Sequence, residues 1–258
     1  SGGPPSYLIA AKTVLGTDAI PGAMDELISE AIVMAQLAGH RNVVELVGVV
    51  TRGDPLVLIL SYCEHGSLLS HLRKQHGFHD PVSLRVKRRM LMEVACGMQH
   101  LAANRFIHRD LAARNVLIAS GIVAKVADFG LSRGGKAATE QGEGDGDVDA
   151  EGAEDGTDYY RSKTGLFPVR WTSPEAMSTA VFTAASDVWS FGIVAVEVVQ
   201  DGVQPYNEWP RQAFVMQKVI GGFKHKRPTG CPDDLHALIQ ACLETDPTHR
   251  PSFARLTD

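Results

Sequence analysis

Three short motifs follow one another along the chain and carry the side chains that phosphoryl transfer requires. They are His108-Arg109-Asp110, then Asn115, and then Asp128-Phe129-Gly130. An alcohol that attacks the terminal phosphate of ATP needs a carboxylate close to its proton, and Asp110 can supply that carboxylate. Asn115 and Asp128 carry the oxygen ligands that Mg²⁺ takes when it also binds phosphate. The motifs therefore predict phosphoryl transfer from ATP, with a two-metal magnesium site at Asn115 and Asp128.

The order of these motifs is more informative than any one of them, because each short string also occurs by chance. With Ser173-Pro174-Glu175 further along, the series resembles that of the eukaryotic protein kinases. Ala112-Ala113-Arg114 resembles the tyrosine-specific, receptor-type branch of that family. The resemblance implies that Asp110 is the catalytic base and that Arg114 helps to seat the phenol of a substrate tyrosine. The segment 167–171 resembles the platform on which tyrosine kinases dock the substrate.

Two charged residues near the start of the chain fit the same family. Residues 7–12 form a short apolar run that ends in Lys12, which predicts a strand. Apolar residues recur at helical spacing from Asp25 to Leu37, and Glu30 interrupts them. The resemblance implies that Lys12 holds the inner phosphates of ATP and that Glu30 pairs with Lys12 in the active state. Without this context, each would be interpreted as a solvated surface side chain.

A hinge and an adenine pocket are expected in the segment that follows the apolar run Leu56–Leu60. Residues 61–68 resemble the connection between the two lobes of a kinase and the start of the next helix. The resemblance implies that Leu60 is the gatekeeper and that main-chain groups of Ser61 and Cys63 bind adenine. A bulky aliphatic gatekeeper is expected to narrow the space behind the base. The residues expected to contact the nucleotide are Ala10, Lys12, Leu60, Ser61, Cys63, Leu117 and Asp128.

The expected architecture is an α+β, bilobal protein-kinase fold with ATP between the lobes. Residues 1–60 are assigned to a small, β-rich lobe with one helix, residues 61–66 to the hinge, and residues 67–258 to a larger helical lobe. The activation segment is expected at residues 128–175. The resemblance also implies a stack of side chains that couples the lobes, formed by Leu46, Met34, Phe129 and His108.

Two long-range contacts are expected in the larger lobe. Residues 186–199 are apolar on all sides, which predicts a buried central helix. The resemblance implies that Asp187 holds the backbone of the catalytic loop near His108 and Arg109, which is compatible with its alternative role as a helix cap. Glu175 and Arg250 resemble a buried ion pair that ties the activation segment to the large lobe.

The activation segment contains an acidic insertion at about residues 134–158. From Glu140 to Asp158 there are nine acidic residues and no basic one, many glycines and no aromatic residue, so disorder is expected. Tyr159 and Tyr160 follow directly and are predicted to be autophosphorylation sites, with simple exposed loop tyrosines as the alternative. Arg109 and Arg133 are the candidate partners of a phosphate there.

Composition and charge exclude several other classes. The chain has 258 residues, of which 44% are hydrophobic, and a net charge of −5, so a sizeable core is expected and a nucleic-acid partner is not. Its apolar stretches fall well short of the roughly 20 residues that span a bilayer, and no signal peptide opens it. We expect a cytoplasmic location, either for a cytosolic protein or for the intracellular domain of a membrane receptor. Membrane contact is expected only through segments outside this chain.

The cysteines add no further site. Cys63, Cys96, Cys231 and Cys242 show no CxxC spacing, so reduced thiols are expected rather than a zinc site or a disulfide framework. Cys63, at the hinge, is expected to be partly accessible. The expected partners are protein substrates that carry tyrosine and a second kinase copy for trans-autophosphorylation.

One feature of the family pattern is missing. A glycine-rich loop of GxGxxG type should precede the strand of Lys12, but only residues 1–6 do so. The intact set of catalytic residues favours a truncated or incomplete sequence over a protein that lacks this loop. The alternative function is a pseudokinase scaffold that binds protein partners without phosphoryl transfer, and a serine/threonine kinase is a lesser alternative.

Overall fold

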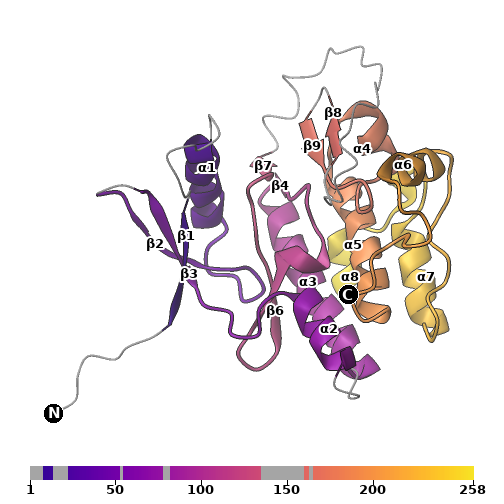
Figure 1. Ribbon diagram of the computed structural model, residues 1–258, viewed down its shortest axis with the longest axis horizontal. Coiled ribbons are helices and arrows are strands. Elements are labelled where there is room, and N and C mark those ends of the chain that lie inside the picture. The colour runs from indigo at the N-terminus through magenta and orange to yellow at the C-terminus, as the bar shows by residue number, and fades with distance from the viewer. Residues whose placement is uncertain (1–7, 14–22, 53–54, 78–81, 135–159, 163–164) are drawn as a thin grey trace.

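The computed structural model describes residues 8–13, 23–52, 55–77, 82–134, 160–162 and 165–258 (Figure 1). The acidic segment predicted at about 134–158 lies almost wholly outside these residues, as does Tyr159. The backbones of Arg133 and Tyr160 are described, but their side chains are not. Among the described residues, no helix is both long and apolar enough to span a membrane.

The N-terminal part is a small antiparallel sheet with one helix. Its strands are β1 (Ile9–Thr13), β2 (Leu46–Val50) and β3 (Val57–Ser61), in the order β1-β3-β2. Helix α1 (Ala23–Gln36) buries one apolar face made of Leu27, Val33 and Met34, because these positions recur with the helical period. The helix predicted from Asp25 to Leu37 is therefore confirmed, with ends displaced by one or two residues.

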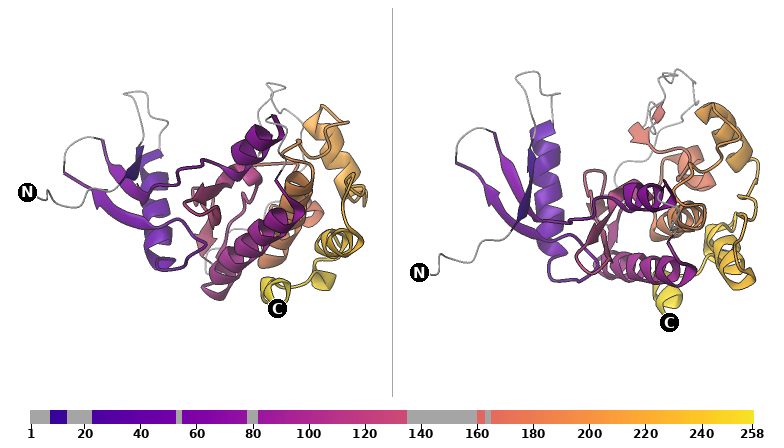
Figure 2. Two further views of the ribbon diagram at one scale, coloured as in Figure 1. Left: turned by 90° about the horizontal axis from the view of Figure 1, so that it is seen from below. Right: turned by 60° about the horizontal axis from the view of Figure 1, so that its bottom comes forward.

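The C-terminal part is mainly helical. Its helices are α2 (Leu68–Gly77), α3 (Leu84–Ala103), α4 (Pro174–Thr179), α5 (Ala184–Val199), α6 (Gln212–Ile220), α7 (Asp233–Cys242) and α8 (Phe253–Thr257), with 3₁₀ turns η1 (Ala113–Asn115) and η2 (Pro247–His249). Short antiparallel pairs join β4 (Phe106–Ile107) to β7 (Arg133–Gly134), β5 (Val116–Ala119) to β6 (Val123–Val126), and β8 (Tyr160–Ser162) to β9 (Gly165–Phe167). The two parts lie side by side in every view (Figures 1 and 2), which confirms the bilobal α+β prediction.

Helix α5 forms the centre of the larger part. Every residue from Ser186 to Val199 is buried, as the apolar character of this stretch predicts. The helix begins with a capping box in which the Thr183 side chain accepts from the Ser186 amide, and the Ser186 hydroxyl accepts from the Thr183 amide. Thr183 is thus the N-cap, which leaves the Asp187 carboxylate available for contacts outside the helix.

The loop after α1 joins the two parts. The Asn42 side chain donates to the Ala124 carbonyl at 3.0 Å, and the Asn42 carbonyl accepts from the Val126 amide at 2.8 Å. Helix α3 has Gly97 at this contact, where a Cβ atom would lie 2.5 Å from the Asn42 carbonyl oxygen and 2.9 Å from Val126 Cγ2. A glycine is therefore required at position 97 by the close approach of two backbones.

We expect Gly97→Ala to destabilise the protein. In a helix, alanine is more favourable than glycine by about 1 kcal/mol. The added Cβ atom would collide with the Asn42 carbonyl oxygen, which cannot move away because it is hydrogen-bonded to the Val126 amide. Overpacking of this kind destabilises the fold by about 1–3 kcal/mol. Urea unfolding should show a net loss of stability. Gly48→Ala is the matched control, because a Cβ atom at Gly48 meets nothing within 4 Å. Equal stability of the two variants would contradict the proposed steric role of Gly97.

Candidate active site

Lys12 connects three elements of the fold. Strand β1 places Lys12 Nζ at 2.7 Å from Glu30 Oε1 on α1 and at 3.0 Å from Asp128 Oδ1 in the larger part. Burial alone would lower the pKa of Lys12, but the negative charges of Asp128 and Glu30 outweigh it and raise the pKa above its ordinary value. The site therefore contains a permanent cation between the two parts of the molecule.

The backbone of the catalytic loop is held by a buried carboxylate on α5. Asp187, which is 2% exposed, accepts from the amide of His108 at 2.8 Å and from the amide of Arg109 at 3.0 Å. Arg109 has φ 68°, a left-handed conformation that costs energy in a non-glycine residue and persists only where surrounding contacts hold it. Burial raises the pKa of Asp187, while His108 and the two amides favour its ionised form. The predicted role of Asp187 is confirmed.

Asp110 lies at the end of this loop with its side chain in contact with Arg114. The Arg114 guanidinium approaches Asp110 Oδ1 at 2.5 Å, and Asn115 Nδ2 donates to the Asp110 carbonyl oxygen at 2.7 Å. The 3₁₀ turn η1 brings both residues back toward Asp110. The structure thus brings together three of the residues that the sequence predicts, with the carboxylate of Asp110 fixed next to a cation.

In the segment 128–130, the first side chain contacts Lys12 and the second is buried. Phe129 is 1% exposed, and its ring centroid lies 5.6 Å from that of His108. The His108 ring also contacts the Ala127 carbonyl oxygen through Nε2 at 3.1 Å. Asp128 has a left-handed φ of 61°, and its carboxylate contacts Lys12 while the neighbouring Phe129 side chain is buried. Within the predicted stack of side chains, His108 and Phe129 are therefore neighbours.

The residues expected at adenine come from both parts of the molecule. Ala10 on β1 pairs with Leu60 on β3, and Leu117 lies on β5, which forms an isolated bridge with Ser67. The amide of Ser61 donates to the Glu45 carbonyl at 3.0 Å, and the carbonyl of Cys63 accepts from the Gly66 amide at 3.2 Å.

The prediction that Cys63 is partly accessible is wrong. Its side chain packs into the core and the residue is only 8% exposed. Burial raises the pKa of the Cys63 thiol, which makes the thiolate less abundant and the sulfur less reactive.

The segment after β9 packs against the catalytic loop. The Trp171 ring lies under the guanidinium of Arg114, with 4.5 Å from Arg114 Cζ to the ring centroid. Arg170 is buried and donates to backbone carbonyls of Pro205, Tyr206, Trp209 and Pro210 at 2.8–3.2 Å. Arg170 therefore fixes residues 167–171, the predicted substrate platform, to the loop before α6.

Sequence reasoning missed the contacts of Arg170 and a buried carboxylate, Glu197. The signal for Glu197 was present, since it is an acidic residue in an otherwise apolar stretch, and buried charges are rarely without partners. No comparable signal existed for Arg170, because its acceptors are backbone groups. The predicted phosphate partner Arg109 has its guanidinium over the Phe182 ring at 5.5 Å.

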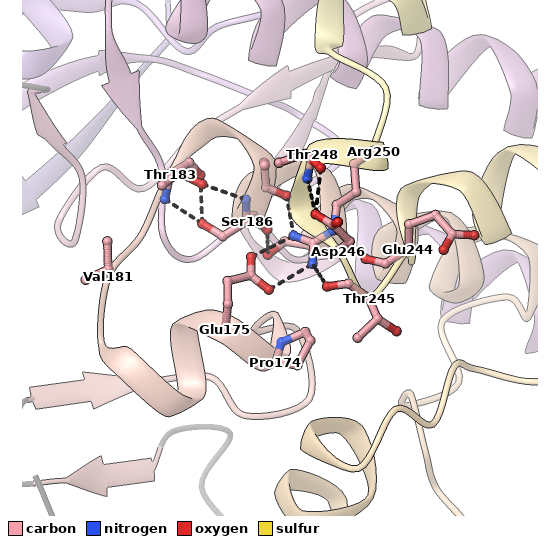
Figure 3. A network of polar contacts seen from close by, with 12 residues as sticks. Pro174, Glu175, Val181, Thr183, Ser186, Glu244, Thr245, Asp246, Thr248 and Arg250 are labelled. Carbon is pink, nitrogen blue, oxygen red and sulfur yellow. Dashed lines mark hydrogen bonds and ion pairs between the residues drawn. The ribbon is translucent and has the colours of Figure 1, made fainter.

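An ion pair holds Glu175, at the end of the predicted activation segment (Figure 3). Arg250 donates to Glu175 through two nitrogens at 2.7 and 2.8 Å, in the bidentate geometry that is typical of a guanidinium and a carboxylate. Arg250 also donates to the carbonyls of Ala185 at 2.8 Å and Glu244 at 2.7 Å. The predicted Glu175–Arg250 pair is confirmed, and it joins α4 to the segment around η2.

Comparison with known proteins agrees with this geometry. The model of the family described as "Protein tyrosine and serine/threonine kinase" matches residues 5–258. The chain is 40% identical over 233 residues to ephrin type-A receptor 3 of Danio rerio and 39% identical over 233 residues to ephrin type-B receptor 2 of Gallus gallus, covering 90% of this chain in both cases. It is 37% identical over 263 residues, or 99% of this chain, to the insulin receptor of Xenopus laevis.

The chain spans only about a fifth of the length of these relatives, namely 22%, 21% and 18% respectively. The similarity therefore concerns one part of each receptor.

Replacing Glu175 by Gln tests the ion pair through its pH dependence. Burial by itself raises the pKa of Glu175, but the hydrogen bonds and charge of Arg250 bring it below the ordinary value of 4.5. A carboxyl group with a lowered folded-state pKa stabilises the fold above its unfolded pKa and loses this contribution as the pH falls through the folded pKa. We expect Glu175→Gln to cost up to about 3 kcal/mol at neutral pH, and the deficit to shrink as the pH falls below about 4.5.

Urea unfolding at a series of pH values measures this deficit. Glu244→Gln is the control. Glu244 Oε1 lies 2.7 Å from Lys224 Nζ, but the Glu244 side chain is 41% exposed, so water screens this ion pair. The loss of unfolding free energy in this variant should therefore be at most about 1 kcal/mol. A deficit in Glu175→Gln that does not change with pH would contradict the assignment.

Proposed function

Because the chain belongs to the protein tyrosine and serine/threonine kinase family, as its match over residues 5–258 shows, we propose that it transfers the terminal phosphoryl group of ATP to tyrosine hydroxyls of proteins. The observation that carries this proposal is the pair of contacts from Lys12 to Glu30 and Asp128. These contacts unite side chains that the sequence separates widely and place a cation beside a partly exposed carboxylate. Phosphate recognition by a kinase requires such an arrangement.

In the proposed reaction, Asp110 orients the phenol and accepts its proton while the new bond from oxygen to phosphorus forms. The bond from that phosphorus to the bridging oxygen breaks, and ADP leaves with its electron pair. Arg114 supports this role because its guanidinium contacts Asp110 and lies over the Trp171 ring, next to the expected substrate platform. Lys12 binds the inner phosphates, and Glu30 holds Lys12 in position.

Asn115 and Asp128 are the residues that we propose to hold Mg²⁺. They fit a hard cation, because both offer oxygen ligands: the Asn115 amide nitrogen is used by the Asp110 carbonyl, which leaves the amide oxygen for a metal, and the Asp128 side chain is 48% exposed. Bound magnesium would neutralise charge on the phosphates of ATP.

The adenine ring is proposed to bind where β1, β3 and β5 meet. Ala10, Leu60 and Leu117 would contact its faces, and the main chain of Ser61 and Cys63 would bind its edge. Residues 61–66 would then act as the hinge between lobes 1–60 and 67–258.

Regulation is proposed to act through the activation segment, residues 128–175. Tyr159 and Tyr160 would be phosphorylated by a second copy of the kinase, and Arg109 and Arg133 would bind the phosphates. The relatives named above are receptors, which supports the proposal that this chain is the intracellular domain of a receptor, with the membrane reached only through other segments.

The test is phosphate transfer from ATP to a mixed Glu/Tyr polymer, followed by phosphoamino acid analysis. The chain should be assayed together with the residues that naturally adjoin it. We expect phosphotyrosine, and a loss of at least about 100-fold in Asp110→Asn because the amide cannot accept the proton. Asp233→Asn is the matched control, since its side chain is 93% exposed and pairs only at the surface with Arg227.

Other outcomes contradict specific parts of the proposal. Phosphoserine or phosphothreonine in place of phosphotyrosine would make the chain a serine/threonine kinase. No transfer at all, even after incubation for autophosphorylation, would favour the scaffold function. Equal activity in Asp110→Asn and in the unsubstituted chain would exclude Asp110 as the base.

A further inference from the structure

Glu197 is a buried acidic side chain that the proposed reaction does not use. It lies near the end of α5, is 1% exposed, and is surrounded by the apolar residues of that helix. A carboxylate in such surroundings is costly unless hydrogen bonds satisfy it. Its Oε2 atom accepts from Trp171 Nε1 at 2.8 Å and from the Ala113 amide at 3.0 Å.

These two donors come from segments that would each contact the substrate. Trp171 ends the platform segment that follows β9, and Ala113 begins η1 in the catalytic loop. Since both hydrogen bonds converge on one oxygen, a shift of either segment relative to the other breaks at least one of them. Glu197 therefore fixes the position of the platform relative to the catalytic loop.

The same contacts extend to the reactive group. Ala113 is followed by Arg114, whose guanidinium contacts the Asp110 carboxylate and lies 4.5 Å from the centre of the Trp171 ring. Glu197 thus holds both the backbone that carries Arg114 and the ring on which Arg114 rests.

Helix α5 supports the catalytic loop at both ends. Asp187 binds the amides of His108 and Arg109, and Glu197, about 15 Å further along the helix axis, binds the amide of Ala113. The loop from His108 to Ala113 is consequently hydrogen-bonded at each end to an acidic side chain of one buried helix.

We propose that Glu197 is a positioning residue that sets the geometry of the phosphoacceptor site through Trp171, Ala113 and Arg114. This inference rests on the proposed kinase function. Because it is 1% exposed, Glu197 itself would touch neither ATP nor the peptide. Its removal should therefore impair transfer to tyrosine more than it impairs the binding of ATP, whose phosphates would be held by Lys12 in the smaller part.

Three variants test this proposal. Trp171→Phe removes the indole N–H but keeps an aromatic ring under Arg114. Glu197→Ala removes the hydrogen-bond acceptor, whereas Glu197→Gln keeps an acceptor oxygen. Trp209→Phe is the matched control, because it removes an indole that stacks on Tyr206, with a centroid distance of 5.8 Å, in the loop before α6.

Three measurements separate the possibilities: steady-state kinetics with a tyrosine peptide, the KM for ATP, and the midpoint of thermal unfolding. We expect kcat/KM for the peptide to fall about 10- to 100-fold in Trp171→Phe and Glu197→Ala, as misplacement of a reacting group does. The KM for ATP should change much less than kcat/KM for the peptide, because Lys12 lies outside the displaced segments. Glu197→Gln should retain more peptide transfer than Glu197→Ala. Unchanged peptide transfer, or an equal fold-change in the KM for ATP and in kcat/KM for the peptide, would overturn the positioning role.

Hydrogen exchange keeps this test independent of the kinase assay. The Ala113 amide should exchange faster in Trp171→Phe and Glu197→Ala but not in Trp209→Phe, whatever reaction the protein catalyses. If the unsubstituted chain fails to phosphorylate tyrosine, the proposed function is wrong, whereas unchanged exchange at Ala113 in both variants would overturn the coupling itself.

Discussion

The hydrogen bonds from the catalytic loop to buried carboxylates of α5 are the interaction on which the rest of the active site depends. Carboxyl groups are seldom buried without hydrogen bonds, so Asp187 and Glu197 require the backbone amides that they bind. Those amides in turn are held in place. The left-handed conformation of Arg109 is sustained by this support. A loop without regular secondary structure thereby obtains a fixed geometry from a rigid helix, as preorganised catalysis requires.

Ion pairs of Lys12 connect the smaller part of the molecule to the larger part. Lys12 bonds to Glu30 within its own part and to Asp128 across the junction, so the separation of the two parts is coupled to the position of α1. Because Lys12 is partly exposed, the two contacts are screened by water and weaker than buried ion pairs. The hydrogen bonds of Asn42 with Ala124 and Val126 are buried instead, so water does not screen them. The two parts are therefore joined by strong contacts at Asn42 and by weaker contacts at Lys12.

Two arginines hold the segment that would receive the substrate. Arg170 binds carbonyl oxygens of the loop before α6, and Arg250 binds Glu175 together with the Ala185 carbonyl. A guanidinium presents several donors in one plane and so can bind several acceptors at once, which a lysine cannot do in the same geometry. These contacts position the platform from its outer side, whereas Glu197 binds it from the core.

The sequence by itself determined the family, the fold class, the buried helix α5 and the Glu175–Arg250 pair, and it predicted the residues that we propose for the reactive site. Motif order and apolar periodicity are local properties, so they can be read without coordinates, as Asp110 and Glu30 illustrate. Only the tertiary structure decided that Cys63 is buried, and that Trp171 and Ala113 share one oxygen of Glu197. Burial and hydrogen-bond partners depend on segments far apart in the chain, and no local pattern specifies which of them will meet.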